Sequence, residues 1–180
     1  MKNSSMNSFS QFRRLFVLIL PVSYYFLPKE KVILLCLVFM AAAVFMRYLK
    51  SGFKINIKPN FLSNIFSPGP GCIFLAFSCF IAVFFFSRIV ALNSMLFIIL
   101  GNTFADMVSA RYGRATEILT FCYACLSASL FLLFFPLVLG WHIALLGCLA
   151  GAFIRVLNLP INKDLSVALS SGIIMRLFLF

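Results

Sequence analysis

The sequence has very few acidic residues and too few charges of either sign to cover a soluble protein. Among 180 residues there are 4 aspartates and glutamates, against 15 lysines and arginines, with one tryptophan and one histidine. Only 11% of the residues are charged, whereas 63% are hydrophobic, and the mean hydropathy is +1.10. Soluble domains are about 45–50% apolar. The composition therefore excludes a soluble enzyme, leaves no room for a separate soluble domain and predicts an integral membrane protein.

The basic residues do not form the patch that nucleic-acid binding requires, although the net charge is +11. They stand between apolar runs, where positive charge orients transmembrane helices and attracts anionic lipid headgroups. The expected partners are therefore membrane lipids and not nucleic acid. The one CxxC motif, Cys122 to Cys125, has no second cysteine pair and no nearby histidine. We interpret the six cysteines as small packing residues and not as a zinc or redox site.

Seven apolar segments have the length of helices, and none shows the strict alternation of a barrel strand. The sequence predicts an all-α fold, a polytopic transmembrane helical bundle of about seven spans. Residues 1–11 are polar and are expected to form a mobile cytoplasmic N-terminus before a single transmembrane domain over residues 12–180. The predicted spans are Leu15–Leu27, Val32–Leu49, Cys72–Ser87, Ile89–Leu100 with its continuation, Ile118–Leu139, Ile143–Ile154 and Leu165–Phe180.

Basic residues are divided unequally between the two sets of loops that seven spans create. If the N-terminus is cytoplasmic, eleven basic residues fall on the cytoplasmic side and four on the other. The positive-inside rule therefore predicts a cytoplasmic N-terminus. It also places the region Asp106–Arg114 and the loop Asn158–Asp164 on the same, cytoplasmic side, where two polar clusters can form one site.

One stretch combines apolar residues with polar groups that lipid would penalise. It runs from Leu96 to Arg114 and reads LFIILGNTFADMVSARYGR. On a helix, Asn102 and Asp106 are four residues apart and Ser109 is three further on, so the three share a face. A carboxylate inside a transmembrane segment costs about 2.5–3.5 kcal/mol on insertion scales and marks a functional-site hypothesis. Asp106 is the one carboxylate within a predicted apolar span, and it is the leading candidate site residue.

Three motifs occur in a recognisable order: FRRLFVLILPVSYYFLPKE, then GNTFADMVSARYGR, then GAFIRVLNLPINKDLSV. Together they resemble the CTP-dependent lipid kinase family, which includes dolichol kinase, phytol kinase and the fungal-type diacylglycerol kinase. Its bacterial members are often labelled phosphatidate cytidylyltransferase. The chain departs from the family pattern at several positions. The aspartate of the family's Gly-Asp pair is Asn102, the Lys-Ser/Thr-x-Glu-Gly segment is reduced to Arg114–Ile118, the usual glutamate of the C-terminal helix is replaced near Arg155, and the Asp-Asn pair reads Lys163-Asp164.

The resemblance implies phosphate transfer from a nucleoside triphosphate, CTP, to a lipid alcohol such as diacylglycerol or a polyprenol, in the bacterial cytoplasmic membrane. This reaction uses Mg²⁺ or another divalent cation, held by carboxylate or amide oxygens, and arginine or lysine to neutralise developing charge. No Walker-type GxxxxGK[ST] is present. The candidate metal ligands are Asn102, Asp106 and Glu117. The candidate catalytic residues are Asp106, Arg111 and Arg114. The candidate nucleotide-binding residues are Gly101, Thr103, Asn162, Lys163 and Asp164.

Each candidate also has a structural interpretation. Arg111 and Arg114 suit positive-inside anchors, and Asn102 suits a hydrogen bond between helices. Asp106 suits an ion pair with a nearby arginine in an inert bundle, and Glu117 suits a solvated loop. The alternatives to a kinase are a cytidylyltransferase that forms a CDP-activated lipid, a catalytically silent relative, and a small transporter that binds a cation at Asp106. The internal repeat common in transporters is absent from the sequence.

Overall fold

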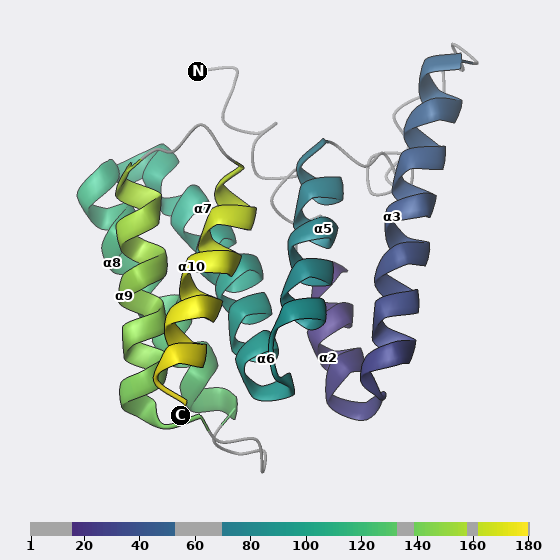
Figure 1. The fold of residues 1–180 in the computed structure, drawn as a ribbon. Coiled ribbons are helices and arrows are strands. Elements are labelled where there is room, and N and C mark those ends of the chain that lie inside the picture. Colours follow the sequence, from purple (N-terminus) through teal and green to yellow (C-terminus); the bar gives the residue numbers. More distant parts are fainter. Residues whose placement is uncertain (1–15, 53–69, 133–138, 158–161, 180) are drawn as a thin grey trace.

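The structure is a computed structural model that describes residues 16–52, 70–132, 139–157 and 162–179. Every regular element in those ranges is helical, which confirms the predicted all-α fold (Figure 1). Several parts of the chain are outside the described ranges. They include the N-terminus predicted to be mobile (residues 1–11), residues 53–69, and residues 158–161 of the loop Asn158–Asp164. The elements are η1 (Phe16–Leu18), α2 (Ile19–Phe26), α3 (Lys29–Gly52), α5 (Pro70–Phe85), α6 (Arg88–Leu96), η2 (Phe97–Gly101), α7 (Asn102–Tyr112), α8 (Arg114–Leu132), α9 (Trp141–Leu157) and α10 (Lys163–Leu177).

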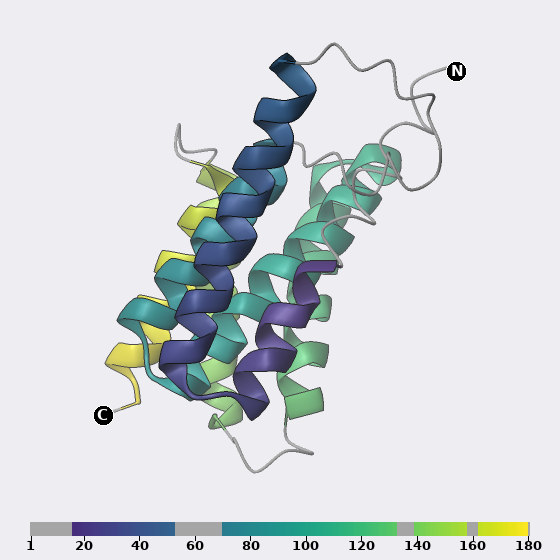
Figure 2. The ribbon, with the colours of Figure 1, turned by 90° about the vertical axis from the view of Figure 1, so that its right-hand side faces the viewer.

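Successive helices run up and down alternately in one bundle (Figure 1). α2 and α3 form one side and pack on α6 and α5, respectively, while α8, α9 and α10 form the other side (Figures 1 and 2). At one end of the bundle, α7 leads into α8 and α10 begins; we call this end the polar end. At the opposite end, α2 leads into α3, α5 leads into α6 and α9 begins.

The helix that carries the leading candidate residues lies at the centre of the bundle. α6, the π-helical turn η2 and α7 form one continuous helix, in which α6 and η2 contact α5, α8 and α10. In the segment Arg88–Ser109, 78% of the most apolar 18-residue stretch is buried inside the bundle. The corresponding share for Ala115–Leu132 of α8 is 28%. Among the described residues, these two helices are long and apolar enough to cross a membrane, whereas Ile73–Phe85 and Trp141–Leu157 are shorter apolar helices.

Five helices begin two to four residues earlier than the sequence predicts, and α3, α8 and α9 are three of them. The first residues of these three are Lys29, Arg114 and Trp141, where the predicted spans begin at Val32, Ile118 and Ile143. The polar residues just before these predicted spans therefore form first helical turns, in which an acidic residue such as Glu117 is favoured by the helix dipole. Gly113 has a φ of 88°, a value that glycine adopts without strain, and it joins α7 directly to α8.

Glycines let the helices approach each other closely below the polar end. A Cβ atom at Gly101 would lie 2.8 Å from the ring of Phe121, and one at Gly151 would lie 3.1 Å from the same ring. Phe121 is fully buried and therefore fills the space between η2 and α9. One turn earlier on the same face of α9, Gly147 faces Met175 of α10. Small residues in this pattern are typical of tightly packed membrane helices.

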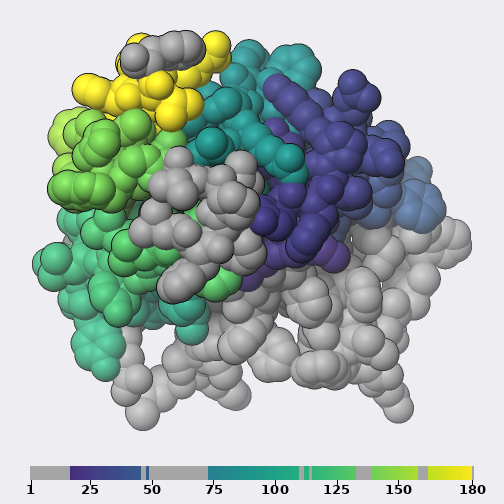
Figure 3. Space-filling view, turned by 90° about the horizontal axis from the view of Figure 1, so that it is seen from below, coloured from purple at the N-terminus to yellow at the C-terminus, as the bar shows by residue number. Residues whose placement is uncertain are grey.

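Three exposed basic side chains close helix ends at the opposite end, which Figure 3 views directly. Lys29 Nζ donates to Phe84 O at 3.0 Å, and Arg176 Nη1 donates to Phe85 O at 3.0 Å. The guanidinium of Arg88 donates to Tyr24 O, at 3.0 Å from Nε and 2.8 Å from Nη2, and also to Tyr25 O. The last carbonyls of a helix have no partner inside it, so these side chains satisfy the ends of α2 and α5.

Candidate functional site

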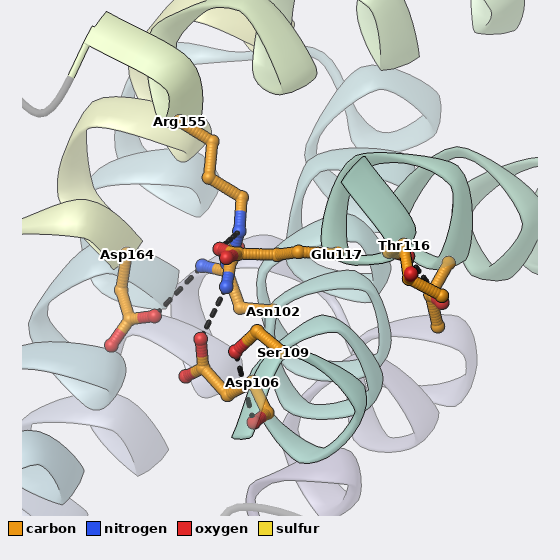
Figure 4. A network of polar contacts seen from close by, with 8 residues as sticks. Asn102, Asp106, Ser109, Thr116, Glu117, Arg155 and Asp164 are labelled. Carbon is orange, nitrogen blue, oxygen red and sulfur yellow. Dashed lines mark hydrogen bonds and ion pairs between the residues drawn. The ribbon is translucent and has the colours of Figure 1, made fainter. Parts of the chain in front are cut away.

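Four of the predicted polar residues lie together at the polar end (Figure 4). Asn102 and Asp106 project from one face of α7, Glu117 from the first turn of α8 and Asp164 from the first turn of α10. Three of the four acidic residues of the whole sequence are thus in one cluster. Ser109 is adjacent, but its hydroxyl donates to the backbone oxygen of Asp106 at 3.2 Å. Residues far apart in the sequence therefore form one polar network.

Arg155, near the end of α9, joins three of these side chains. Its Nε donates to Glu117 Oε1 at 2.7 Å and its Nη1 donates to Asn102 Oδ1 at 2.5 Å. Its Nη2 forms an ion pair with Asp106 Oδ1. The Arg155 side chain is 1% exposed, against 14% for Glu117 and 28% for Asp106. The guanidinium is therefore buried in the middle of the network, and side-chain oxygens replace its water.

Asn102 extends the network to α10. Its Nδ2 donates to Asp164 Oδ1 at 2.8 Å, and Asp164 is 3% exposed. The backbone N–H of Asp164 donates to Asn162 Oδ1 at 3.0 Å, so Asn162 is the N-cap of α10. A carboxylate in this first turn also interacts favourably with the helix dipole. Two of the predicted nucleotide-binding residues therefore begin a helix.

The other predicted nucleotide-binding residues do not form a phosphate cradle together. Gly101 packs against the side chains of α8. Thr103 is 1% exposed, and its hydroxyl has no hydrogen-bond partner in the described part of the chain. Lys163 is exposed at the first position of α10. The predicted catalytic residues Arg111 and Arg114 lie near the end of α7 and at the start of α8, and their side chains are outside the described part of the structure.

The candidate metal ligands surround a guanidinium. Asn102, Asp106 and Glu117 each direct an oxygen to Arg155. A second cation at contact distance from this guanidinium would be repelled by it. Among the residues that the structure describes, no group of three or more His, Cys, Asp and Glu side chains could hold a metal ion. The arrangement therefore does not fit a resident divalent cation.

Two features of the network differ from the sequence-based expectation. Glu117 is not a solvated loop residue, because it lies in a helix and accepts a hydrogen bond from Arg155. The sequence also contained an unused signal for Arg155 itself. Gly147, Gly151 and Arg155 are spaced four residues apart, which places them on one face of a helix. Because small residues at this spacing mark a packed face, an arginine that continues the face is expected to be buried and to need acidic partners.

The network offers a ligand one partly accessible acidic group. Asp106 is the most exposed of the three side chains in the two ion pairs, and it lies below the Arg155 guanidinium in the view of Figure 4. A carboxylate there can accept a proton or a hydrogen bond from a molecule that approaches the polar end. Comparisons of the chain with protein-family models, with curated proteins and with solved structures found no match.

Proposed function

We propose that this protein is an integral membrane lipid kinase that transfers phosphate from a nucleoside triphosphate to a lipid alcohol. CTP is the proposed donor, and diacylglycerol or a polyprenol is the proposed acceptor, on the basis of the resemblance described above. The observation that carries the proposal is the convergence of Asn102 and Asp106 with Asp164 at one end of an apolar bundle. These residues belong to the two motifs that the resemblance associates with nucleotide chemistry.

The exposed apolar surface of the bundle supports insertion in a membrane, and we propose about seven spans in the bacterial cytoplasmic membrane with a cytoplasmic N-terminus on the basis of the sequence. Leu119 and Tyr123 of α8 are 71% and 76% exposed, Phe153 of α9 is 64% exposed and Phe84 of α5 is 54% exposed. Exposed apolar surface costs about 25 cal/mol per Å² in water, and a lipid environment removes this cost. Helix Arg88–Ser109 has 22 residues, so its length of about 33 Å matches a hydrocarbon core.

Asp106 has the central chemical role in this proposal. Its partly exposed carboxylate accepts the proton of the lipid hydroxyl as that oxygen attacks the terminal phosphorus of the nucleotide. The bond between this phosphorus and the β,γ-bridging oxygen breaks, and the nucleoside diphosphate leaves. Arg111 and Arg114, whose backbone flanks Gly113 at the same end, bind the phosphates. Since Asn102, Asp106 and Glu117 do not fit a resident ion, magnesium would arrive as part of the nucleotide complex.

One observation favours a second function. Arg155 binds Asn102, Asp106 and Glu117 together, and this is the arrangement expected where the polar residues only hold helices together. The second candidate is therefore a catalytically silent relative whose polar end is structural. A cytidylyltransferase would use the same nucleotide at the same end and differs in the phosphorus atom that is attacked.

A label-transfer experiment tests the kinase proposal. Membranes that contain the wild type, Asp106→Asn or Glu30→Gln receive γ-labelled CTP or ATP, magnesium, and diacylglycerol or polyprenols. We expect labelled lipid from the wild type and from Glu30→Gln, because Glu30 is the one acidic residue of the sequence outside the network. Asp106→Asn is expected to lose about 10²-fold or more of the activity. Its Tm is measured in parallel, because Asp106 also pairs with Arg155.

The other outcomes separate the alternatives. Folded wild type that labels no lipid with either nucleotide contradicts the kinase. Label from α-labelled CTP that enters lipid when phosphatidate is supplied as the acceptor then identifies a cytidylyltransferase, and its absence favours the silent relative. An Asp106→Asn variant that is folded and fully active contradicts the role of Asp106.

A further inference from the structure

We propose that the guanidinium of Arg155 takes the place of a divalent cation in this protein, so that a cation site opens at the polar end only when that side chain is removed. The inference concerns the assembly of the helices and does not depend on catalysis. It predicts that the wild type has no resident divalent ion at this position and needs none for stability.

The first argument for this proposal is the set of oxygen atoms around the guanidinium. A carboxylate oxygen from Asp106, a carboxylate oxygen from Glu117 and an amide oxygen from Asn102 all meet it. Carboxylate and amide oxygens are the ligands that hard divalent cations prefer. Two helices supply them, since Asn102 and Asp106 belong to α7 and Glu117 belongs to α8. Arg155 brings the positive charge from a third helix, α9.

The second argument is the balance of charge between Arg155 and the carboxylates of Asp106 and Glu117. Asp106 and Glu117 both direct an oxygen to the same guanidinium, whose side chain is 1% exposed. If the guanidinium is removed, both carboxylates lose this shared positive partner. Like charges in a poorly solvated place strongly favour an added cation. A small divalent cation supplies more charge than the guanidinium supplied.

The third argument is the packing beneath the network, which does not depend on Arg155 alone. Arg155 Cζ lies 5.8 Å from the centroid of the Phe121 ring, in the range of a cation–π contact. That ring is held from two sides by Gly101 and Gly151. Phe121 is fully buried, so the floor below the network does not depend on Arg155 alone. We therefore expect the oxygen atoms to stay near their positions in variants that shorten Arg155.

The experiment compares purified full-length wild type with Arg155→Ala and Arg155→Gln, in detergent and without nucleotide or lipid substrate. Thermal unfolding is followed by circular dichroism in EDTA and in MnCl₂, and bound Mn²⁺ is counted by electron paramagnetic resonance. We expect the wild type to have the same Tm in both solutions. In EDTA, both variants should have a lower Tm than the wild type. Both should bind Mn²⁺, and their Tm should rise by about 5–10 °C when Mn²⁺ is at 100 times its Kd.

Arg88→Ala is the matched control. Arg88 also donates through its guanidinium to two acceptors, but these are the backbone oxygens of Tyr24 and Tyr25. We expect its Tm to be the same in EDTA and in MnCl₂. Methylguanidinium at low millimolar concentration provides a second readout, because it should raise the Tm of Arg155→Ala and leave Arg88→Ala unchanged. A variant that merely lost packing would not respond to either cation in this selective way.

Three results would overturn the proposal. The first is a saturable rise in the wild-type Tm with Mn²⁺ that Asp106→Asn abolishes, since an ion would then bind beside Arg155. The second is the absence of any Mn²⁺ effect on Arg155→Ala and Arg155→Gln, because Arg155 would then be an ordinary buried pair. The third is an equal Mn²⁺ effect on Arg88→Ala. Each is read without an activity assay, so failure of the kinase proposal leaves the test intact.

Discussion

The two ends of the bundle use basic side chains in different ways. At the polar end, Arg155 is buried, and its partners are side-chain oxygens that include two carboxylates. At the opposite end, Lys29, Arg88 and Arg176 are exposed, and their partners are backbone carbonyls at the ends of α2 and α5. Both arrangements satisfy hydrogen bonds between helices, but only the first balances formal charge inside the protein.

The difference follows from solvation. An exposed cation keeps part of its water, so a carbonyl oxygen and the negative end of a helix dipole are sufficient partners. A buried cation has lost its water, and effective desolvation costs several kcal/mol per ion unless opposite charge and hydrogen bonds replace it. We therefore expect the two ends to respond differently when a partner is removed, and the following predictions test this in order of decreasing effect.

Arg155→Leu should have the largest effect. It leaves Asp106 and Glu117 without the guanidinium, and removal of one member of a buried pair costs about 3–5 kcal/mol. Adding Asp106→Asn and Glu117→Gln to this variant should restore part of the stability, because no uncompensated charge then remains. The measurement is the free energy of unfolding in detergent. A cost below about 1 kcal/mol, as for an exposed pair, would show that the two ends are equivalent.

Asn102→Asp should come second. The Asn102 amide donates to the Asp164 carboxylate at 2.8 Å, and the substitution puts two carboxylates at that contact. We expect a loss of about 1.5–3 kcal/mol, the range for a hydrogen bond to a charged group. Lowering the pH should restore part of this loss, because a protonated carboxyl can donate as the amide does. The measurement is Tm against pH, with Asn102→Leu as a control that should show no such recovery.

Gly101→Ala and Gly172→Ala compare packing at the two ends. A Cβ atom at Gly101 would lie 2.8 Å from Phe121, and one at Gly172 of α10 would overlap the ring of Phe86. We expect each to cost about 1–3 kcal/mol through overpacking. Similar values from thermal unfolding would show that the ends differ in charge and not in packing density. Stability losses that differ severalfold would mean that the two ends also differ in packing density.

Arg88→Gln and Arg176→Gln should have the smallest effects. Each variant keeps a side-chain N–H donor, and each wild-type residue is exposed with carbonyl partners. A loss of about 0.5–1.5 kcal/mol is expected, the net value of a typical hydrogen bond. The measurement is Tm in the same detergent as for Arg155→Leu. A loss for Arg88→Gln as large as that for Arg155→Leu would contradict the distinction between the ends.

The helices could be predicted from the sequence because apolar segments and the polar residues between them are local signals. The face shared by Asn102 and Asp106 followed from their spacing, and both contact Arg155. The helix starts could not be placed, because short polar segments such as Pro28–Lys31 have the same composition in a turn and in a first helical turn. Length and composition predicted seven spans, and two of the described helices are long and apolar enough to cross a membrane.

The network itself could not be predicted in full, because it depends on which helices are neighbours. The interpretation of Asp106 as one half of an ion pair anticipated the contact but not the partner. Arg155 stands 49 residues away in the sequence, just after the predicted span Ile143–Ile154. Asp164 was assigned to a loop, whereas its burial depends on the position of α10 against α7.

The π-helical turn η2 lets the central helix contain one extra residue without a change in the faces of the segments on either side of it. A π turn contains one more residue than an α turn and completes nearly the same rotation. Deletion of one residue within Phe97–Gly101 would therefore leave a plain α-helix in which Asn102 and Asp106 still face Arg155. In evolutionary terms, the turn can absorb the gain or loss of one codon while the polar network stays connected.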